Sequence, residues 1–238
     1  MKKNEGAACS GDIQCVSGNC SGNVCAPPFC SADIICGTQC SFGGLIYGTV
    51  TGSDSKCWFD RNLGATQVAT AYNDSNAYGW YFQWGRGADG HQISTSGTTS
   101  IFSSSDNPGH SNFIISDNVN PYDWRSPPND NLWQGVNGIN NPCPTGFRLP
   151  TQAEWSALVA AAGITGQATA YSSTLKFPSA GIRNYLSAGI QDPGNLGAYW
   201  SSNTSSVSAV LLYFNLSGVS TSDTYVRTYG SSVRCIKN

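Results

Sequence analysis

Cysteine content is the feature that most constrains how this chain can fold. Seven of its ten cysteines lie between residues 9 and 40. The full set is Cys9, Cys15, Cys20, Cys25, Cys30, Cys36, Cys40, Cys57, Cys143 and Cys235. The cluster has no C-x-x-C pair and no nearby histidine, so disulfides are favoured over zinc and we expect all ten to be bonded. Disulfides persist in oxidising compartments, which favours a secreted or cell-surface protein without a bound metal or cofactor.

The cysteine-rich start predicts two units of unequal size. Residues 1–29 contain almost no large apolar side chains, and so short a segment holds its shape only when it is cross-linked. We therefore expect a two-disulfide knot between Cys9 and Cys25, whose connectivity stays open because four cysteines allow three pairings. Pro27 and Pro28 then form a stiff, extended step into a main domain over residues 30–238.

Charge and hydropathy exclude several classes of partner. Charged residues make up 11% of the chain, the net charge is -2, and the twelve Lys and Arg residues are scattered. A nucleic-acid partner is not expected, because it requires a basic stripe. No apolar run approaches the roughly 20 residues of a membrane span, so direct membrane insertion is not expected either. The start is polar, and we expect any signal or anchor to lie outside the printed sequence.

The middle of the chain predicts one hairpin followed by long ordered loops. Residues 45–50 alternate as a strand, and residues 56–59 form its partner across a Gly-Ser-Asp turn. Residues 60–140 are rich in Asn, Asp, Gly, Ser and Pro and show no sustained periodicity. Four tryptophans in this region would be wasted in a disordered segment, so we expect them to fasten the loops to the core. They are Trp80, Trp84, Trp124 and Trp133.

One helix is indicated clearly. Thr151 and Glu154 form a T-x-x-E capping box, and Gly163 supplies a terminating residue. Apolar residues between them recur at helical spacing. A lone carboxylate is far more often a cap than a general acid, so Glu154 is assigned to the helix.

Short strands are expected after the helix, which makes the fold class α+β. The expected strands are residues 175–177, 185–186, 199–202, 209–215 and 232–236. Cys143 and Cys235 bracket this region, and a bond between them would close a loop of roughly ninety residues and stabilise the domain by ~4 kcal/mol in the entropy model.

Several motifs, in order along the chain, resemble one known family. They are Asp60-Arg-Asn-Leu-Gly-Ala65, Phe82-Gln-Trp-Gly-Arg86, Asn141-Pro-Cys-Pro-Thr-Gly-Phe-Arg-Leu-Pro-Thr151, Tyr199-Trp-Ser-Ser202 and Ser232-Val-Arg-Cys-Ile236. Over residues 36–238 the chain resembles the Fibrobacter-type major paralogous domain, which is similar to the formylglycine-generating-enzyme branch of the C-type-lectin fold. The resemblance implies a C-type-lectin-like domain with long ordered loops.

The end of the chain also resembles the variable proteins of diversity-generating retroelements. In those proteins a Trp-Ser-Ser strand precedes a hypervariable stretch, in which randomised template adenines cannot yield Lys, Glu, Gln, Met or Trp. Residues 201–232 contain none of these types, whereas the other 206 residues contain 24. Composition alone would give about four in this window, although a polar Ser/Thr-rich surface also avoids several of them.

The resemblance and the composition predict a variable ligand-binding surface at about residues 199–231. Tyr gives rigid amphipathic contacts, and Ser, Thr and Asn adapt their hydrogen bonds. The expected contact set is Tyr199, Asn203, Thr204, Ser206, Val210, Leu211, Tyr213, Asn215, Ser220, Ser222, Asp223, Tyr225, Tyr229 and Ser231. In residues 209–215 we expect Val210, Leu211 and Tyr213 to be exposed. Structural roles are expected for Trp200, Arg227, Arg234 and Cys235.

The predicted function is recognition of a macromolecular ligand, protein or glycan, without catalysis. The main alternative is a constant adhesin or cell-wall-binding module of the same fold. A formylglycine-type oxidase is less favoured, because it needs a reactive cysteine pair near the C-terminus. His91 and His110 lie outside any hydrolase or zinc motif, and with Asp89 they are expected to pin loops. Asp54 and Asp60 match no calcium-loop pattern.

Overall fold

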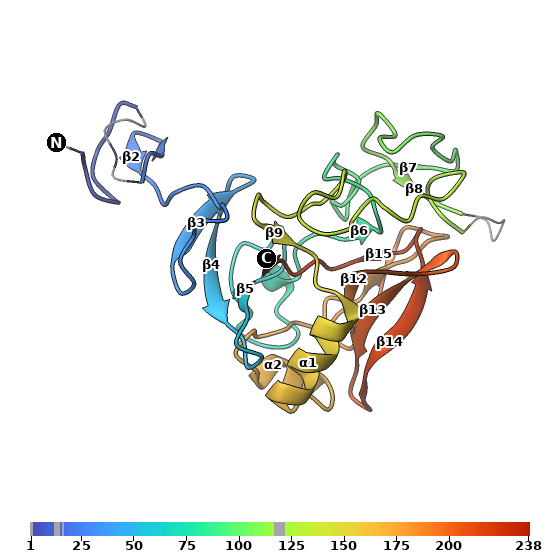
Figure 1. Ribbon diagram of the computed structural model, residues 1–238. Helices are drawn as coiled ribbons and strands as arrows, with labels where there is room; N and C mark the ends of the chain where they lie inside the picture. The colour runs from blue at the N-terminus through green and yellow to red at the C-terminus, as the bar shows by residue number, and fades with distance from the viewer. Residues whose placement is uncertain (1, 12–14, 16, 117–121) are drawn as a thin grey trace.

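Pairing between the start and the end of the main domain organises the fold. The computed structural model describes residues 2–11, 15, 17–116 and 122–238. The expectations for residues 1–29 and 60–140 that fall on other positions lie outside the described residues. The chain is a mixed, mostly sheet fold with few helices (Figure 1). None of the helices in the described ranges is long and apolar enough to cross a membrane.

The largest sheet has the strand order β3-β4-β5-β16-β9. Its strands are β3 (Gln39–Phe42), β4 (Leu45–Thr51), β5 (Cys57–Phe59), β16 (Ile236–Lys237) and β9 (Phe147–Arg148). The expected hairpin is confirmed, since Thr51 pairs with Cys57 in antiparallel register. Ile236 pairs with Trp58 on one side and with Arg148 on the other. The last strand of the chain therefore lies between two strands that precede it by many residues.

A second sheet contains most of the C-terminal region. It has the order β12-β13-β14, from β12 (Gly197–Ser205), β13 (Ser208–Phe214) and β14 (Val219–Val226). The helix α1 (Gln152–Ala162) contacts all three strands and covers one face of the sheet (Figure 1). The expected strands at 199–202 and 209–215 are confirmed in position, and β14 lies where no strand was predicted.

Smaller sheets link the central loops to this framework. One has the order β11-β10-β15-β6, and β7 pairs with β8 in parallel. The bounds are β6 (Phe82–Gln83), β7 (Thr98–Thr99), β8 (Phe113–Ile114), β10 (Ile182–Arg183), β11 (Ile190–Gln191) and β15 (Gly230–Ser231). A short 3-10 helix, η2 (Ser75–Ala77), and the helix α2 (Gln167–Ser172) complete these connections. Most of the described part of 60–140 is irregular, as predicted.

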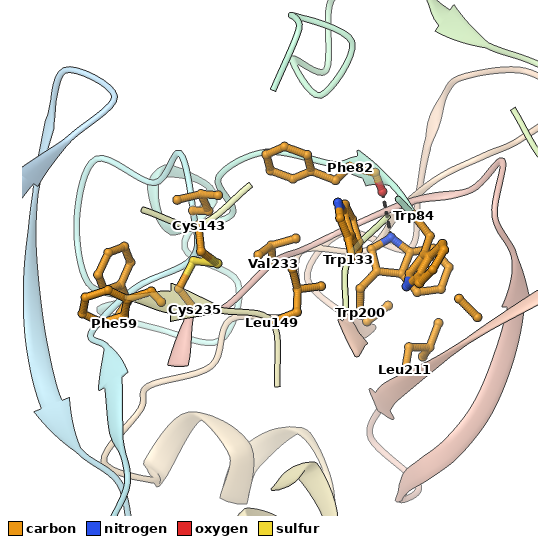
Figure 2. Packing of buried hydrophobic residues seen from close by; sticks show 14 of the residues in the cluster. Phe59, Phe82, Trp84, Trp133, Cys143, Leu149, Trp200, Leu211, Val233 and Cys235 are labelled. Carbon is orange, nitrogen blue, oxygen red and sulfur yellow. Dashed lines mark hydrogen bonds between the residues drawn. A yellow bond between two sulfur atoms is a disulfide. The ribbon is translucent and has the colours of Figure 1, made fainter. Parts of the chain in front are cut away.

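Buried tryptophans hold the central loops on the core. Trp84, Trp124 and Trp133 are fully buried, which confirms the prediction for three of the four, whereas Trp80 is only partly buried. The indole of Trp84 donates to the Ser201 carbonyl at 2.9 Å. Figure 2 shows Trp84 and Trp133 packed beside Trp200, whose indole donates to the Phe82 carbonyl at 2.7 Å. Each indole N–H in this group is hydrogen-bonded, so aromatic burial leaves no polar atom unsatisfied.

Helix α1 begins and ends as its sequence predicts. The Glu154 amide donates to the Thr151 hydroxyl at 3.2 Å, and the Thr151 amide donates to the Glu154 carboxylate at 2.8 Å. Gly163 follows the helix in the left-handed conformation, with φ 62°. By contrast, the strands expected at 175–177 and 185–186 are wrong. Leu175 and Phe177 are buried by side-chain packing in a loop, without strand pairing.

All ten cysteines are paired, which confirms the expected disulfides. The pairs are Cys9–Cys20, Cys15–Cys25, Cys30–Cys40, Cys36–Cys57 and Cys143–Cys235. The first two lie in the knot, which also contains β1 (Cys20–Ser21) and β2 (Val24–Cys25) and which Figure 1 shows apart from the main body. The last joins positions 92 residues apart and lies inside the main core (Figure 2).

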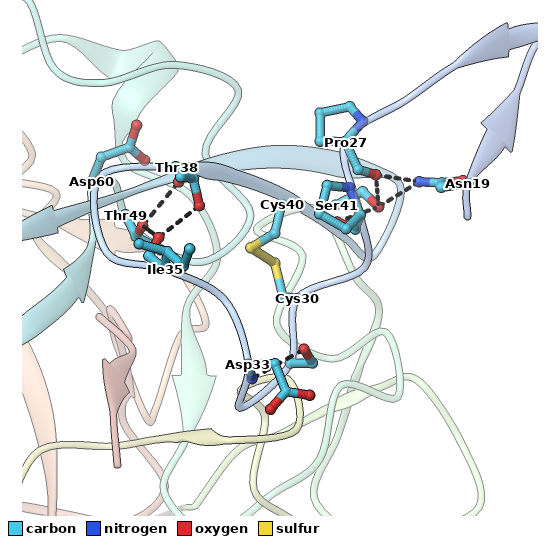
Figure 3. The surroundings of a disulfide bond; sticks show 12 residues. Asn19, Pro27, Cys30, Asp33, Ile35, Thr38, Cys40, Ser41, Thr49 and Asp60 are labelled. Carbon is cyan, nitrogen blue, oxygen red and sulfur yellow. Dashed lines mark hydrogen bonds between the residues drawn. A yellow bond between two sulfur atoms is a disulfide. The ribbon is translucent and has the colours of Figure 1, made fainter. Parts of the chain in front are cut away.

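The junction between knot and main domain combines a disulfide with polar contacts. Cys30–Cys40 ties the connecting segment to β3 (Figure 3). The Asn19 side-chain amide donates to the Pro27 carbonyl at 2.6 Å and to the Ser41 hydroxyl at 2.9 Å. The knot is thus linked to the main domain by a few hydrogen bonds and by the chain itself.

Candidate ligand-binding site

The β12-β13-β14 sheet is covered along much of β13 on both faces. Side chains alternate regularly along the strand. Ala209, Leu211 and Tyr213 pack with the cluster that contains the tryptophans, and Leu212 and Phe214 pack with the cluster that contains α1. Val210 and Leu211 are 6% and 0% exposed, so the expectation that they face solvent is wrong. The prediction assumed one solvated face, whereas this strand lies between two hydrophobic clusters.

Two further residues of the expected contact set are also buried. Tyr199 is fully buried, and its hydroxyl donates to the Pro178 carbonyl at 2.6 Å while its ring stacks on Phe214. Ser231 is fully buried in β15, where it pairs with Phe82 of β6. Both residues belong to the core of the free chain, because strands pair or pack over them, and neither can contact a ligand at the surface.

The other ten residues of the set remain accessible to different extents. Asn203, Ser206 and Ser222 are exposed. The partly exposed members are Thr204, Tyr213, Asn215, Ser220, Asp223, Tyr225 and Tyr229. The side chain of Asn203 accepts a hydrogen bond from the Gln152 amide at 2.7 Å, so it is committed to the start of α1. The expected contact set therefore does not form one surface. Asn203 lies beside α1, whereas the three tyrosines of the accessible set pack against the tryptophan cluster on the opposite side of the sheet.

Four partly exposed tyrosines gather on the side opposite α1. The ring centroids of Tyr185 and Tyr229 are 4.6 Å apart, and those of Tyr229 and Tyr225 are 5.1 Å apart. Tyr213 lies on the same face of the sheet as Tyr225, because Tyr225 pairs with Ala209 and strand alternation places Ala209 and Tyr213 together. We call Tyr185, Tyr213, Tyr225 and Tyr229, with Asp192 and Asp223 beside them, the tyrosine face.

A hollow of about 280 Å³ adjoins this face. It lies between the turn after β11 and the turn between β13 and β14, and it is lined by Asp192, Asn195, Leu196, Tyr213, Asn215, Leu216 and Ser217. The Asn215 side-chain amide donates to the Tyr213 hydroxyl at 3.1 Å, which fixes the orientation of both. Sequence reasoning missed Tyr185, Asp192 and Asn195. They come from another segment, and no local pattern in the sequence places them beside β13.

The tyrosine face is electronegative. Burial, together with neighbouring Tyr213 and Asp223 and smaller effects of Tyr229 and Asp192, raises the pKa of Tyr225 to about 12. Among the described residues, Asp192 and Asp223 form no salt bridge, and no lysine or arginine lines the hollow. The two carboxylates therefore supply the charge of the face.

Buried arginines fix the elements that carry the face, as predicted for Arg227 and Arg234. Arg227 donates to the Ser206 carbonyl at 2.9 Å and pairs with Asp123, and its guanidinium lies over the Trp84 ring. Arg234 donates to the carbonyls of Phe59 and Leu175. Each guanidinium thus cross-links loops that would otherwise present unpaired carbonyls.

The remaining polar groups considered from the sequence have structural roles. The Asp89 carboxylate lies 2.7 Å from Nδ1 of buried His91, and the Gln83 amide donates to Nε2 of that ring. Burial lowers the pKa of His91 to about 4, against the effect of Asp89. Asp54 accepts from the Trp58 indole, and Asp60 pairs with its neighbour Arg61.

One cluster of potential metal-ligating side chains occurs among the described residues. It consists of Cys9, Cys15 and Cys25. All three sulfurs are bonded in disulfides, so none is a thiolate that could bind a metal.

No family model matches this chain. No curated protein and no solved structure matches it either.

Proposed function

We propose that this protein is an extracellular recognition protein with a C-type-lectin-like domain, and that the tyrosine face binds a macromolecular ligand. The observation that carries the proposal is the cluster of partly exposed tyrosines beside a hollow, on a sheet whose buried residues are already fully packed. Tyrosines supply large contact area at low entropic cost, as they do in antibody binding loops. The face performs no chemistry in this proposal.

The scaffold supports that role. Three of the tyrosines pack against the tryptophan cluster, which contains the Cys143–Cys235 bond, and buried Arg227 holds the turn between β12 and β13. Ser220, which pairs with Tyr213 at the rim of the face, is polar and partly exposed. Substitutions at such positions usually change stability by under ~0.5 kcal/mol. The surface can therefore differ between related chains without loss of the fold.

The oxidase alternative lacks its central requirement. Formylglycine-type chemistry needs a reactive cysteine pair, and both cysteines of the C-terminal half, Cys143 and Cys235, are bonded to each other and buried. Cys235 directly precedes β16, which pairs with β5 and β9 in the largest sheet, and Cys143 lies in the loop before β9. This geometry favours a structural bond over a redox pair.

Binding is tested with ligands selected on the full chain. The wild-type protein, with its disulfides intact, is used to select from a displayed random-peptide library and to probe a glycan array. The combined Tyr213→Ser, Tyr225→Ser and Tyr229→Ser variant is compared, and we expect it to lose the selected ligands because the aromatic contact area is removed. These rings also pack against the core, so folding of the variant is checked by circular dichroism.

A second variant leaves the packing in place. Ser220→Arg adds bulk and charge at the rim of the face, opposite Tyr213 in the sheet, and is expected to block the same ligands. The matched control is Tyr72→Ser with Tyr171→Ser, which removes two accessible tyrosines that do not belong to the tyrosine face and should keep binding. The proposal is overturned if no ligand is enriched on the wild type over the triple variant.

Diversification of the surface has a separate test. A retroelement variable protein would have a near-identical repeat in the flanking DNA, differing at adenines, and a neighbouring reverse transcriptase gene. A constant adhesin of the same fold would have neither. Sequencing that DNA therefore separates the two forms of the proposal without changing the binding experiment.

A further inference from the structure

Two carboxylates lie beside the tyrosines of the tyrosine face. Most described carboxylates in or near the main core already have a cationic partner, such as Asp89 with Arg86 and Glu154 with Arg148. Asp192 lines the hollow with Tyr213, and Asp223 pairs with Leu211 on the tyrosine side of the sheet. Neither carboxylate forms a salt bridge among the described residues. The face thus presents two carboxylates that the protein itself does not neutralise.

Nearby arginines cannot act as the counter-charge for Asp192 and Asp223, because their hydrogen bonds are already made elsewhere. The guanidinium of Arg183 donates to the carbonyls of His91, Ile93 and Ala188 and lies over the Phe113 ring. Arg227 is likewise fully committed to Asp123, Asp130 and a backbone carbonyl. Both are 2% exposed or less, so neither can turn toward the surface without breaking several hydrogen bonds.

A surface that combines aromatic rings with carboxylates is suited to binding basic side chains. Ammonium and guanidinium groups bind over tyrosine rings and pair with carboxylates, and both interactions strengthen when water is excluded. The contacts that link Tyr185, Tyr229 and Tyr225 leave part of each ring accessible, and the hollow beside Tyr213 gives depth for a long side chain. Phosphate or sialylated ligands would meet only like charge here.

We propose that the tyrosine face binds a Lys- or Arg-rich segment of a protein partner, with basic side chains over the tyrosines and paired to Asp192 and Asp223. This inference rests on the proposed function and specifies its ligand. Charge complementarity carries it: a neutral ligand would bury two carboxylates without a counter-charge, which costs binding free energy.

The test compares charge variants of the full chain. Peptides selected on the wild type are expected to be enriched in Lys and Arg, and their affinity is expected to fall as salt is raised. Asp192→Asn with Asp223→Asn keeps the shape of both side chains and removes both charges, and should weaken the resynthesised peptide about tenfold. Asparagine is compatible with the left-handed backbone at Asp192, where φ is 52°.

A charge-matched control and two separate outcomes complete the design. Glu5→Gln with Asp33→Asn removes the same charge at exposed positions away from the face and should leave affinity unchanged. Tyrosine-dependent ligands that are neutral sugars, or peptides without basic residues, would overturn this inference while leaving the proposed function standing. Ligands that bind the triple serine variant equally well would overturn the proposed function itself.

Discussion

The N-terminal knot and the main domain are held together by opposite means. Among the described residues of the knot, the buried hydrophobic cluster consists of Cys9, Cys15 and Cys25, with Cys20 packed against it. In the main domain, two hydrophobic clusters bring together tryptophans, aromatic rings and aliphatic side chains from distant segments. The described part of the knot is held by cross-links between buried cysteines, whereas the main domain has a hydrophobic core to which disulfides are added.

This difference indicates which substitutions each part can tolerate without loss of stability. A segment without an apolar core depends on its covalent bonds, since burial contributes little to its free energy of unfolding. A domain with a dense aromatic core depends on side-chain packing and tolerates changes at its rim. The largest effects on the main domain should therefore come from the core and the smallest from the knot.

The strongest expected effect follows from Trp84→Ala. Trp84 is fully buried, donates to the Ser201 carbonyl, packs against Trp133 and lies beneath Arg227. Truncation leaves a cavity and an unsatisfied carbonyl, and we expect the free energy of unfolding to fall by about 3–5 kcal/mol. Chemical denaturation followed by near-UV circular dichroism measures it.

The control for that change is Tyr72→Ala, at a residue that is 41% exposed. It should cost under ~0.5 kcal/mol. A loss below about 1 kcal/mol for Trp84→Ala would contradict the view that aromatic packing dominates the main domain.

An intermediate effect is expected at the cap of α1, and it depends on pH. Burial opposes ionisation of Glu154, but hydrogen bonds from Arg148 and from the Thr151 backbone outweigh it and lower the pKa of Glu154 to about 2. Its stabilising effect is therefore fully present above the ordinary value of 4.5 and is lost as the pH falls through about 2. We expect Glu154→Gln to cost about 1 kcal/mol at neutral pH.

Denaturation of both proteins over a pH series measures this effect. The difference between Glu154→Gln and the wild type should shrink as the pH falls below 4.5. A difference that stays constant down to the lowest pH at which the protein folds would show that the charge of Glu154 is irrelevant. Ser156→Ala, on an exposed part of the same helix, serves as the control.

The smallest effect on the main domain should come from breaking the knot. Replacing Cys9 and Cys20 with serine removes one of the two bonds that maintain the knot. Amide hydrogen exchange should show loss of protection in the knot, while the unfolding free energy of the main domain changes by under ~0.5 kcal/mol. A larger change would mean that the contacts of Asn19 with Pro27 and Ser41 couple the two parts.

Short sequence patterns correctly predicted the structural features that depend mainly on neighbouring residues. The capping box at Thr151, the hairpin of β4 and β5 and the pairing of all ten cysteines follow from patterns within short stretches or from cysteine usage. β14 was missed because Val219–Val226 is rich in Ser and Thr and shows no apolar alternation. Its strand conformation comes from pairing with β13, which is a tertiary effect.

The candidate site was predicted only in part for a related reason. Tyr213, Tyr225 and Tyr229 lie on one surface, as expected. Val210 and Leu211 do not, because the sequence of a strand does not reveal that a helix covers one face and a tryptophan cluster the other. Tyr185 and Asp192 reach the site through the β10 and β11 pairing, which no short motif encodes.

The double coverage of β13 has an evolutionary consequence. Residues 209–212 of that strand are closed to solvent, so selection for folding keeps them apolar whatever ligand is bound. Selection for an apolar side chain is weaker on either side of this strand segment, at residues 203–206 and 220–225, because these positions are partly or fully exposed. The stretches in which mutations can accumulate are therefore interrupted along the gene, and in the fold they lie on the two outer strands of a sheet whose middle strand must stay apolar.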